Sequence, residues 1–391
     1  MSTRALRAAR DPRKRRGDLD DRRGDLDLFD VTPDEEQTLI QQTLREYAVA
    51  QVRPAASTAD AAACTPDALL AQLDELGLSM VGVPEQLGGT MHAQAAVTAV
   101  LVGEALAHGD MRIAYAALAP GAVATAIARW GTPEQQASYL PAFSGAQTPA
   151  AALAVLEPAP LFDPERLRTR ARRSRGAWTL DGAKSLVARA GDCSLLLVAA
   201  EAAGIGPALF LVESPARGLT VEPEPAMGLR AAATGRLLLR GVRAPDSALL
   251  GAAPSAVYGD CVQRARIAWC ALAVGCAQAV LDYVIPYVKE RVAFGEPIAN
   301  RQAVAFAVSD MAVESAGMRL ASYRAASLAD SGGDFARAAA LARTLCAEHS
   351  MRIGSQGVQL LGGHGFTTEH PVERWFRDLR AAGVMEGALL V

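Results

Sequence analysis

The spacing of apolar residues changes character twice along this chain of 391 residues, near residue 151 and again near residue 256. Before the first change and after the second, apolar side chains recur every three or four residues, as at Leu69, Leu70, Leu73 and Leu76, which predicts helices. Between the two changes the apolar runs are short and bounded by Gly, Pro or Asp, which predicts strands. A helical unit, a small sheet domain and a second helical unit are therefore expected.

This pattern divides the chain into four segments of an α+β multidomain protein. Residues 1–28 alternate Arg and Asp with few apolar side chains and bury too little surface to offset their ordering entropy, so we expect a disordered charged tail. A presequence or a nucleic-acid arm is the alternative, and the aspartates argue against a presequence. Residues 29–150 are expected to form an N-terminal α-helical domain and residues 151–255 a middle β-barrel. Residues 256–391 are expected to form a four-helix bundle, with helices near 256–291, 302–330, 335–361 and 371–383.

Local signals mark several element ends. Thr32–Glu35 predicts a helix start with Thr as N-cap, Pro in the first position and Glu completing a capping box. The full helix-start motif recurs at Thr132–Gln135, and Thr65–Asp67 has the same Thr-Pro start without the Glu or Gln. Trp178–Leu180 followed by Asp181–Gly182 predicts a strand that enters a tight turn.

Bulk properties exclude several function classes. The net charge of −3 gives no reason to expect nucleic acid or a membrane surface as a partner. No apolar run approaches the roughly 18–20 residues of a membrane-spanning helix, so no span is expected. The six cysteines lack metal-type spacing, and Cys270 and Cys276 lie in an apolar helix, where buried thiols are expected. These features predict a cytoplasmic protein without a metal site.

Four motifs follow one another in the last hundred residues. They read RVAFGEPI at 291–298, QLLGGHGF at 359–366, RD at 377–378 and MEG at 385–387. In this order and spacing they resemble the C-terminal domain of the acyl-CoA dehydrogenase family, whose pattern is R-x-x-F-G-x-P-I, Q-x-x-G-G-x-G-F/Y, R-D and a carboxylate followed by Gly. VPEQLGG at 83–89 and GTPEQQ at 131–136 resemble the N-terminal domain of the same family. The resemblance covers roughly residues 30 to 390 and is strongest after residue 285.

The resemblance implies a reaction and a catalytic base. The family removes a proton from the α-carbon of an acyl-CoA thioester while hydride leaves the β-carbon for flavin N5, giving the trans-2-enoyl-CoA. Glu386 matches the family's base, and we expect an apolar, water-poor slot around it that strengthens a base towards carbon acids. Some relatives carry the base on an earlier helix, where this chain has Ala265, so Glu386 is the only candidate. A surface glutamate near a frayed end is the alternative.

Three residues are expected to contact the substrate. Arg266 matches a family arginine near the pocket, with an ordinary helix-surface arginine as the alternative. Met385 and Gly387 flank the expected base, and Gly387 is expected to leave room for the thioester beside the backbone.

Six positions match those that hold the ADP half of FAD in the family: Arg291, Phe294, Gln302, Gln359, Gly362 and Gly363. An arginine fork suits a pyrophosphate, and glycines allow close backbone approach. A helix-end arginine and a glycine C-cap are the alternative. In the family these groups face a neighbouring subunit's FAD, which implies a homo- or hetero-tetramer. The family also implies an electron-transferring flavoprotein as the redox partner.

The middle segment departs from the family pattern where it contacts the flavin ring. The family has T-E-x-x-x-G-S-D and an aromatic-x-Thr/Ser segment, and this chain has apolar residues at the corresponding positions, Leu156, Leu161, Phe162, Leu186 and Ala188. Each hydrogen bond lost to a buried ring atom costs ~1–3 kcal/mol.

Two hypotheses follow from this departure. One is an active FAD-dependent acyl-CoA dehydrogenase that uses Glu386. The other is a weakened or partner-dependent subunit of a mixed tetramer that supplies ADP-side contacts to a different chain. A third class keeps the fold for other flavin chemistry such as hydroxylation, and the retained Glu386 argues against it. The sequence does not fix the acyl chain length.

Overall fold

The structure is a computed structural model that describes residues 31–89, 96–145 and 148–391. The expected tail at residues 1–28 lies outside the described residues. The helices are α1 (Glu35–Tyr47), α2 (Arg53–Ala62), α3 (Asp67–Glu75), α4 (Ala96–Gly109), α5 (Met111–Trp130), α6 (Pro133–Phe143), α7 (Pro254–Glu290), α8 (Gln302–Asp330), α9 (Ala336–Leu361) and α10 (Val372–Leu379). The strands are β1 (Ala151–Ala154), β2 (Arg170–Ser174), β3 (Ala177–Val187), β4 (Leu195–Ala202), β5 (Gly206–Glu213), β6 (Leu219–Pro223), β7 (Gly235–Pro245), β8 (Val292–Ala293) and β9 (Glu296–Pro297).

The N-terminal helices begin close to the predicted positions, with corrections at α1 and at α3, where Pro66 and not Thr65 is the N-cap residue. Helix α6 has Thr132 as N-cap, Pro133 at the first position and a capping box closed by Gln135, as predicted. At α1 the prediction of Thr32 as N-cap is wrong: Asp34 caps the helix, and Gln37 completes the box. A carboxylate in this position accepts the free N–H groups of the first turn as well as a hydroxyl does, so the cap moves two residues along.

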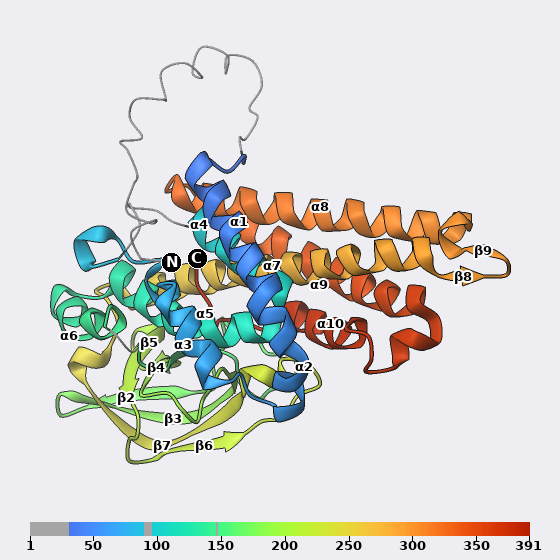
Figure 1. Ribbon diagram of the computed structural model, residues 1–391. Coiled ribbons are helices and arrows are strands. Elements are labelled where there is room, and N and C mark those ends of the chain that lie inside the picture. The colour runs from blue at the N-terminus through green and yellow to red at the C-terminus, as the bar shows by residue number, and fades with distance from the viewer. Residues whose placement is uncertain (1–30, 90–95, 146–147) are drawn as a thin grey trace, which may run out of the picture.

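The middle domain is one curled seven-stranded sheet (Figure 1). Strand order is β1-β4-β2-β3-β7-β6, and β5 pairs with β4 on its other side. The tight turn predicted at Asp181–Gly182 is wrong, because β3 continues through both residues with a register shift against β7. Gly182 is needed there for another reason: a Cβ on it would lie 2.6 Å from the Cα of Thr169. The glycine marks a bulge in a strand, which has the same sequence signal as a turn.

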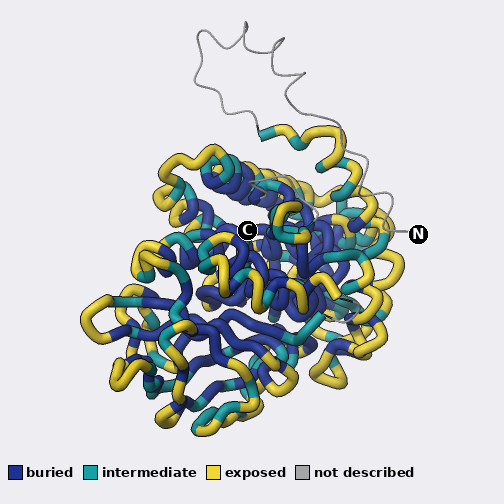
Figure 2. Tube along the Cα trace, turned by 90° about the vertical axis from the view of Figure 1, so that its left-hand side faces the viewer, coloured by how far each residue is buried: buried dark blue, intermediate teal, exposed yellow. Residues whose placement is uncertain are grey.

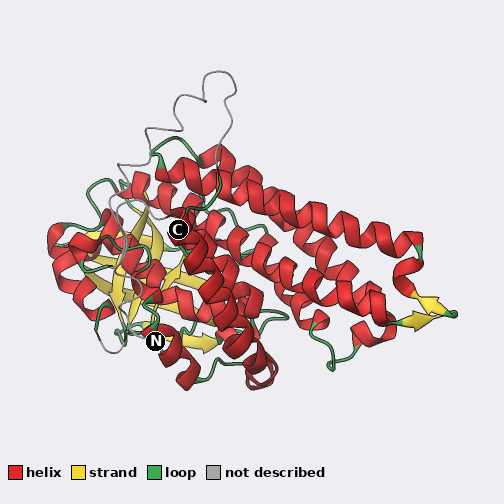
Figure 3. Cartoon of the chain, turned by 45° about the horizontal axis from the view of Figure 1, so that its top comes forward, coloured by secondary structure: helices red, strands yellow, loops and turns green. Residues whose placement is uncertain are grey.

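The C-terminal helices confirm the predicted bundle. Helices α7, α8, α9 and α10 begin and end within a few residues of the four predicted segments. Helix α7 is 37 residues long and packs against α4, α8 and α9. Figures 1 and 3 show α7, α8 and α9 extending away from the sheet, with the β8–β9 hairpin at their far end. One end of the bundle is therefore enclosed by the rest of the chain, and the other projects from it.

The interior explains the long apolar helices. Figure 2 shows buried segments running through the helical layer and the sheet. The expectation that no apolar stretch reaches membrane-spanning length is wrong, since Met111–Trp130 and Pro254–Glu290 are long and apolar enough. Within this structure 94% and 83% of their apolar windows are buried, so packing inside the protein accounts for their composition. Cys270 and Cys276 are buried free thiols, as predicted.

Candidate active site

The expected base lies in a largely buried strap, which we define as residues 384–391, after the last helical turn. Glu386 retains only 6% of its exposure, and Met385 and Gly387 beside it are also buried. The strap crosses α7, and the indole N–H of Trp269 donates to the carbonyl of Gly387 at 2.7 Å. Glu386 is therefore held inside the protein and is not at a frayed surface end.

Two arginines from different helices surround the Glu386 carboxylate. Arg266 on α7 approaches both oxygens, with Nε and Nη2 each at 3.3 Å. Arg343 on α9 lies closer, with Nη2 at 3.0 Å from Oε1. The expectation of an apolar slot is therefore corrected: burial is present, but two guanidinium groups share the space. Arg266 contacts the expected base and is not an ordinary helix-surface arginine.

The sequence reasoning missed Arg343. Burial lowers the pKa of this guanidinium, and the neighbouring Glu386 charge opposes that effect. Its second nitrogen, Nη1, donates to the carbonyl of Met385 at 2.7 Å. Arg343 lies in a helix that also carries Arg337 and Arg352, and its own spacing gives no signal that it faces inward. Only the packing of α9 against α7 and the strap selects it.

Gly387 is required by the packing of the strap. Its φ of +72° lies in the left-handed region, and a Cβ here would come within 2.5 Å of the Val155 side chain. In the described arrangement, Val155 fills the space in which we expected the thioester. Contact of Met385 and Gly387 with substrate stays a prediction.

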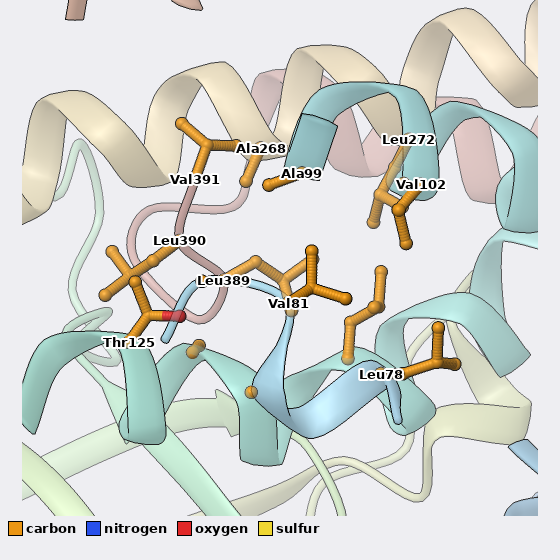
Figure 4. A pocket seen from close by; sticks show the side chains of 15 residues that line it. Leu78, Val81, Ala99, Val102, Thr125, Ala268, Leu272, Leu389, Leu390 and Val391 are labelled. Atoms are coloured by element: carbon orange, nitrogen blue, oxygen red, sulfur yellow. The ribbon is translucent and has the colours of Figure 1, made fainter. Parts of the chain in front are cut away.

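A small apolar cavity lies beside the end of the strap (Figure 4). Its volume is about 30 Å³. A cavity of this size holds only one or two small groups, because a single water needs roughly 10–15 Å³ on this measure. Its walls come from α4, α5, α7, the turn that follows α3 and the strap, through residues that include Val81, Val102, Leu118, Leu272, Leu389 and Leu390. Glu386 is not part of the lining, but Leu389 and Leu390 of the same strap are.

The six expected nucleotide-side positions gather at the projecting end of the bundle. They belong to the β8–β9 hairpin, the start of α8, the end of α9 and the turn Gly362–Phe366, and all six are exposed. Phe294 keeps 96% of its exposure. A Cβ on Gly362 or Gly363 would meet nothing within 4 Å. Gly362 has a φ of +58°, which favours glycine, but neither the packing nor a positive φ requires glycine at position 363. Their chemistry fits a group that approaches from outside the chain, as the ADP half of FAD from a neighbouring subunit would.

The expected ring-side positions offer apolar surface and few free polar groups. Leu156 and Ala188 are buried in the core. The N–H of Leu186 donates to the Glu224 carboxylate at 2.7 Å, and its carbonyl accepts the Tyr115 hydroxyl at 2.9 Å. Both main-chain groups of Leu186 are therefore already used within the chain. The residues fit the nucleotide half of FAD and the flat faces of its ring. None of the expected ring-side positions carries a hydroxyl, and the hydroxyl of the adjacent Ser185 already donates to Glu224 at 2.7 Å.

The Arg377–Asp378 motif has a structural role. Arg377 pairs with Asp60 and with Glu373, each at 2.8 Å. Asp378 is buried beside Arg112 at 3.2 Å and accepts the N–H of Leu229 at 2.8 Å. These contacts tie the C-terminal helices to α2, α5 and the middle domain, as expected for a structural ion pair. In the described part of the chain, no cluster of three or more His, Cys, Asp or Glu side chains is suited to a metal ion.

Comparisons with known proteins agree along most of the chain. Residues 34–146, 152–242 and 256–389 match the N-terminal, middle and C-terminal domain models of acyl-CoA dehydrogenase. The mitochondrial short-chain specific acyl-CoA dehydrogenase of Bos taurus is 31% identical over 362 residues, which cover 90% of this chain and 87% of that protein.

Solved structures give the same result. Butyryl-CoA dehydrogenase from Megasphaera elsdenii superposes with a TM-score of 0.82 at 26% identity, covering 93% of this chain and 96% of that one. A glutaryl-CoA dehydrogenase from Mycobacterium smegmatis in complex with FADH2 also gives 0.82 at 26% identity, covering 91% and 92%. The chain therefore belongs to the acyl-CoA dehydrogenase family and is an oxidoreductase with FAD as its cofactor.

Proposed function

We propose that this enzyme converts a short-chain acyl-CoA to the trans-2-enoyl-CoA, with Glu386 as the base that takes the α-proton. The observation that carries the proposal is the buried Glu386, which lies on a strap fixed from α7 and α9 and in register with the family's C-terminal motifs. A base removes a proton from carbon efficiently only when it is held within reach of that proton and shielded from water. Both conditions depend on the strap.

The chain's own residues have distinct roles in this scheme. Glu386 accepts the proton, and Arg266 and Arg343 keep its side chain oriented. Trp269 anchors the strap through the Gly387 carbonyl. When bound, FAD would supply the acceptor for the hydride that leaves the β-carbon. Arg291, Phe294, Gln302, Gln359, Gly362 and Gly363 would contact its ADP half, and Leu156, Leu186 and Ala188 would contact the ring.

The small volume of the apolar cavity favours a substrate with a short acyl chain. Apolar side chains of α4, α5 and α7 surround it, and Leu389 and Leu390 close it (Figure 4). Each methylene buried in such a site contributes ~0.8 kcal/mol, but only if there is room for it. The similar enzymes named above include a short-chain specific dehydrogenase and a butyryl-CoA dehydrogenase, which supports the same size class.

The separation of the two ends of α7 supports an oligomer. Arg266 and Arg291 are 25 residues apart on and just after one continuous helix, or about 37 Å at 1.5 Å per residue. One extended FAD does not reach both, so the nucleotide-side positions of one subunit would serve the FAD of another. We propose a tetramer that passes electrons to an electron-transferring flavoprotein. The cytoplasmic location stays a prediction.

Anaerobic reduction tests the proposed function. The purified protein, loaded with FAD, is mixed with butyryl-CoA in the absence of oxygen while the visible flavin absorbance is recorded. The proposal predicts bleaching by butyryl-CoA in the wild type and none in Glu386→Gln at equal FAD content. Bleaching of both proteins, or of neither, would overturn the assignment of Glu386.

A second candidate function is the partner-dependent subunit. It is favoured by the two main-chain bonds of Leu186 to Glu224 and Tyr115, which leave this segment with little to offer a ring edge. Such a subunit would bind little FAD alone and would supply contacts to another chain. A released-flavin assay on the purified homo-oligomer decides: about one FAD per chain excludes this candidate, and a colourless protein that refuses added FAD supports it.

A further inference from the structure

The side chain of Arg343 makes two contacts, and both are with the strap. Nη2 lies 3.0 Å from Oε1 of Glu386, and Nη1 donates to the Met385 carbonyl at 2.7 Å. Its planar guanidinium therefore fixes the base and the backbone that carries the base. Arg266 reaches only the carboxylate in this segment, at 3.3 Å for each bond.

Among the described residues, Arg343 pairs or hydrogen-bonds only with Glu386 and Met385. Its side chain is 17% exposed, so placing it there costs desolvation that the two contacts must offset. A surface arginine on the same helix, Arg337, is exposed and bears no relation to the strap. The inward direction of Arg343 is thus specific to the turn of α9 that faces Glu386.

We propose that Arg343 is a positioning residue that acts through Glu386: it holds the carboxylate and the Met385 peptide in the arrangement from which the α-proton is removed. This inference rests on the proposed function, and it adds a residue that no motif assigned. Displacing a base by about 1 Å costs on the order of 100-fold in rate, so loss of Arg343 should slow proton removal while substrate affinity is kept.

Deuterium exchange into acetyl-CoA isolates this step. The acetyl group has α-protons and no β-carbon, so exchange in D2O reports proton removal without dehydrogenation. Exchange is followed by NMR with the FAD-loaded wild type and with Arg343→Met, Arg343→Lys, Glu386→Gln and the double variant of Arg343→Met with Glu386→Gln. Arg337→Met is the matched control on α9.

We expect Arg343→Met to reduce the maximal exchange rate roughly 10- to 100-fold, with unchanged half-saturation by acetyl-CoA and unchanged FAD per chain. Arg343→Lys restores part of the rate because it keeps the charge but not the fork, and Arg337→Met exchanges like the wild type. In the Glu386→Gln background, Arg343→Met has no further effect, since Arg343 acts through the carboxylate.

Three results would overturn the inference. One is wild-type exchange in Arg343→Met. Another is a loss of exchange rate that is fully explained by a lower content of FAD per chain. The third is that Arg343→Met lowers the exchange rate of Glu386→Gln by the same factor as it lowers that of the wild type. If Arg343→Met does not fold, Arg343→Lys decides, and a full wild-type rate in that variant counts against the inference. Exchange that depends on Glu386 without dehydrogenation of butyryl-CoA would overturn the proposed function but not the inference about Arg343. Absence of Glu386-dependent exchange in the wild type would sink both.

Discussion

The two ends of α7 differ in whether the functional residues beside them are buried and bonded within their own chain. At the enclosed end, Glu386 and the strap are buried and bonded to Arg266, Trp269 and Arg343 of the same chain. At the projecting end, Phe294 is almost fully exposed, and Gly362 and Gly363 have no neighbour that requires their small size. The first region is complete within one chain. The second has the form of a surface made for something outside it.

This difference assigns different functions to residues that the motifs present as one signature. Substitutions around a buried, bonded carboxylate change how that carboxylate reacts. Substitutions in an exposed cluster change only what the cluster binds. Variants at the enclosed end should therefore impair the reaction with the cofactor retained, and variants at the projecting end should impair cofactor binding with the fold retained.

The largest effect is expected for Glu386→Gln. The amide keeps the size of the side chain but accepts no proton, so the rate of flavin reduction by butyryl-CoA should fall about 10²- to 10⁴-fold. FAD content should stay at the wild-type level, because the residue lies far from the projecting end. Stopped-flow absorbance gives the rate and a released-flavin assay gives the content; a parallel loss of FAD would remove the contrast between the two regions.

A smaller effect, of opposite kind, is expected for Arg291→Ala. Loss of a charge-assisted bond to a phosphate costs ~1.5–3 kcal/mol, which is roughly a 10- to 100-fold weaker binding of FAD. The thermal stability of the FAD-free chain should not change, since Arg291 is exposed. Fluorescence titration with FAD measures the affinity, and Arg337→Ala serves as a control at another exposed arginine. Unchanged affinity would show that the projecting end does not serve the cofactor.

The sequence predicted those features of the two regions that depend on residues near one another in the chain, and it missed those that depend on tertiary packing. The bundle helices, and the cap at Thr132, follow from apolar spacing and one short motif, and they are confirmed. The bulge at Gly182 was mistaken for a turn because a strand bulge and a turn use the same Asp-Gly pair. Arg343 could not be found, since its role comes from the packing of α9 on the strap, where its partner Met385 is 42 residues away in the chain. The two guanidinium groups around Glu386 were missed for the same reason.

The smallest effect is expected for Leu389→Ala at the cavity. Shortening this side chain enlarges the cavity, so the preference for hexanoyl- over butyryl-CoA should rise about fourfold for each methylene that gains a buried place. The ratio of kcat/KM values for the two substrates measures this, with Leu341→Ala, which alters an exposed residue of α9, as control. An unchanged ratio would mean that the acyl chain lies elsewhere.

Complementation between two inactive variants tests the central claim, that the active site combines the enclosed end of one chain with the projecting end of another. Glu386→Gln and Arg291→Ala proteins are assayed alone at limiting FAD, then after unfolding and refolding together to form mixed oligomers. A mixed oligomer contains sites in which an intact Glu386 is paired with an intact Arg291 from a neighbour, so the account predicts that activity reappears on mixing. Activity that stays at the sum of the two separate proteins, in oligomers shown to be mixed, would contradict it.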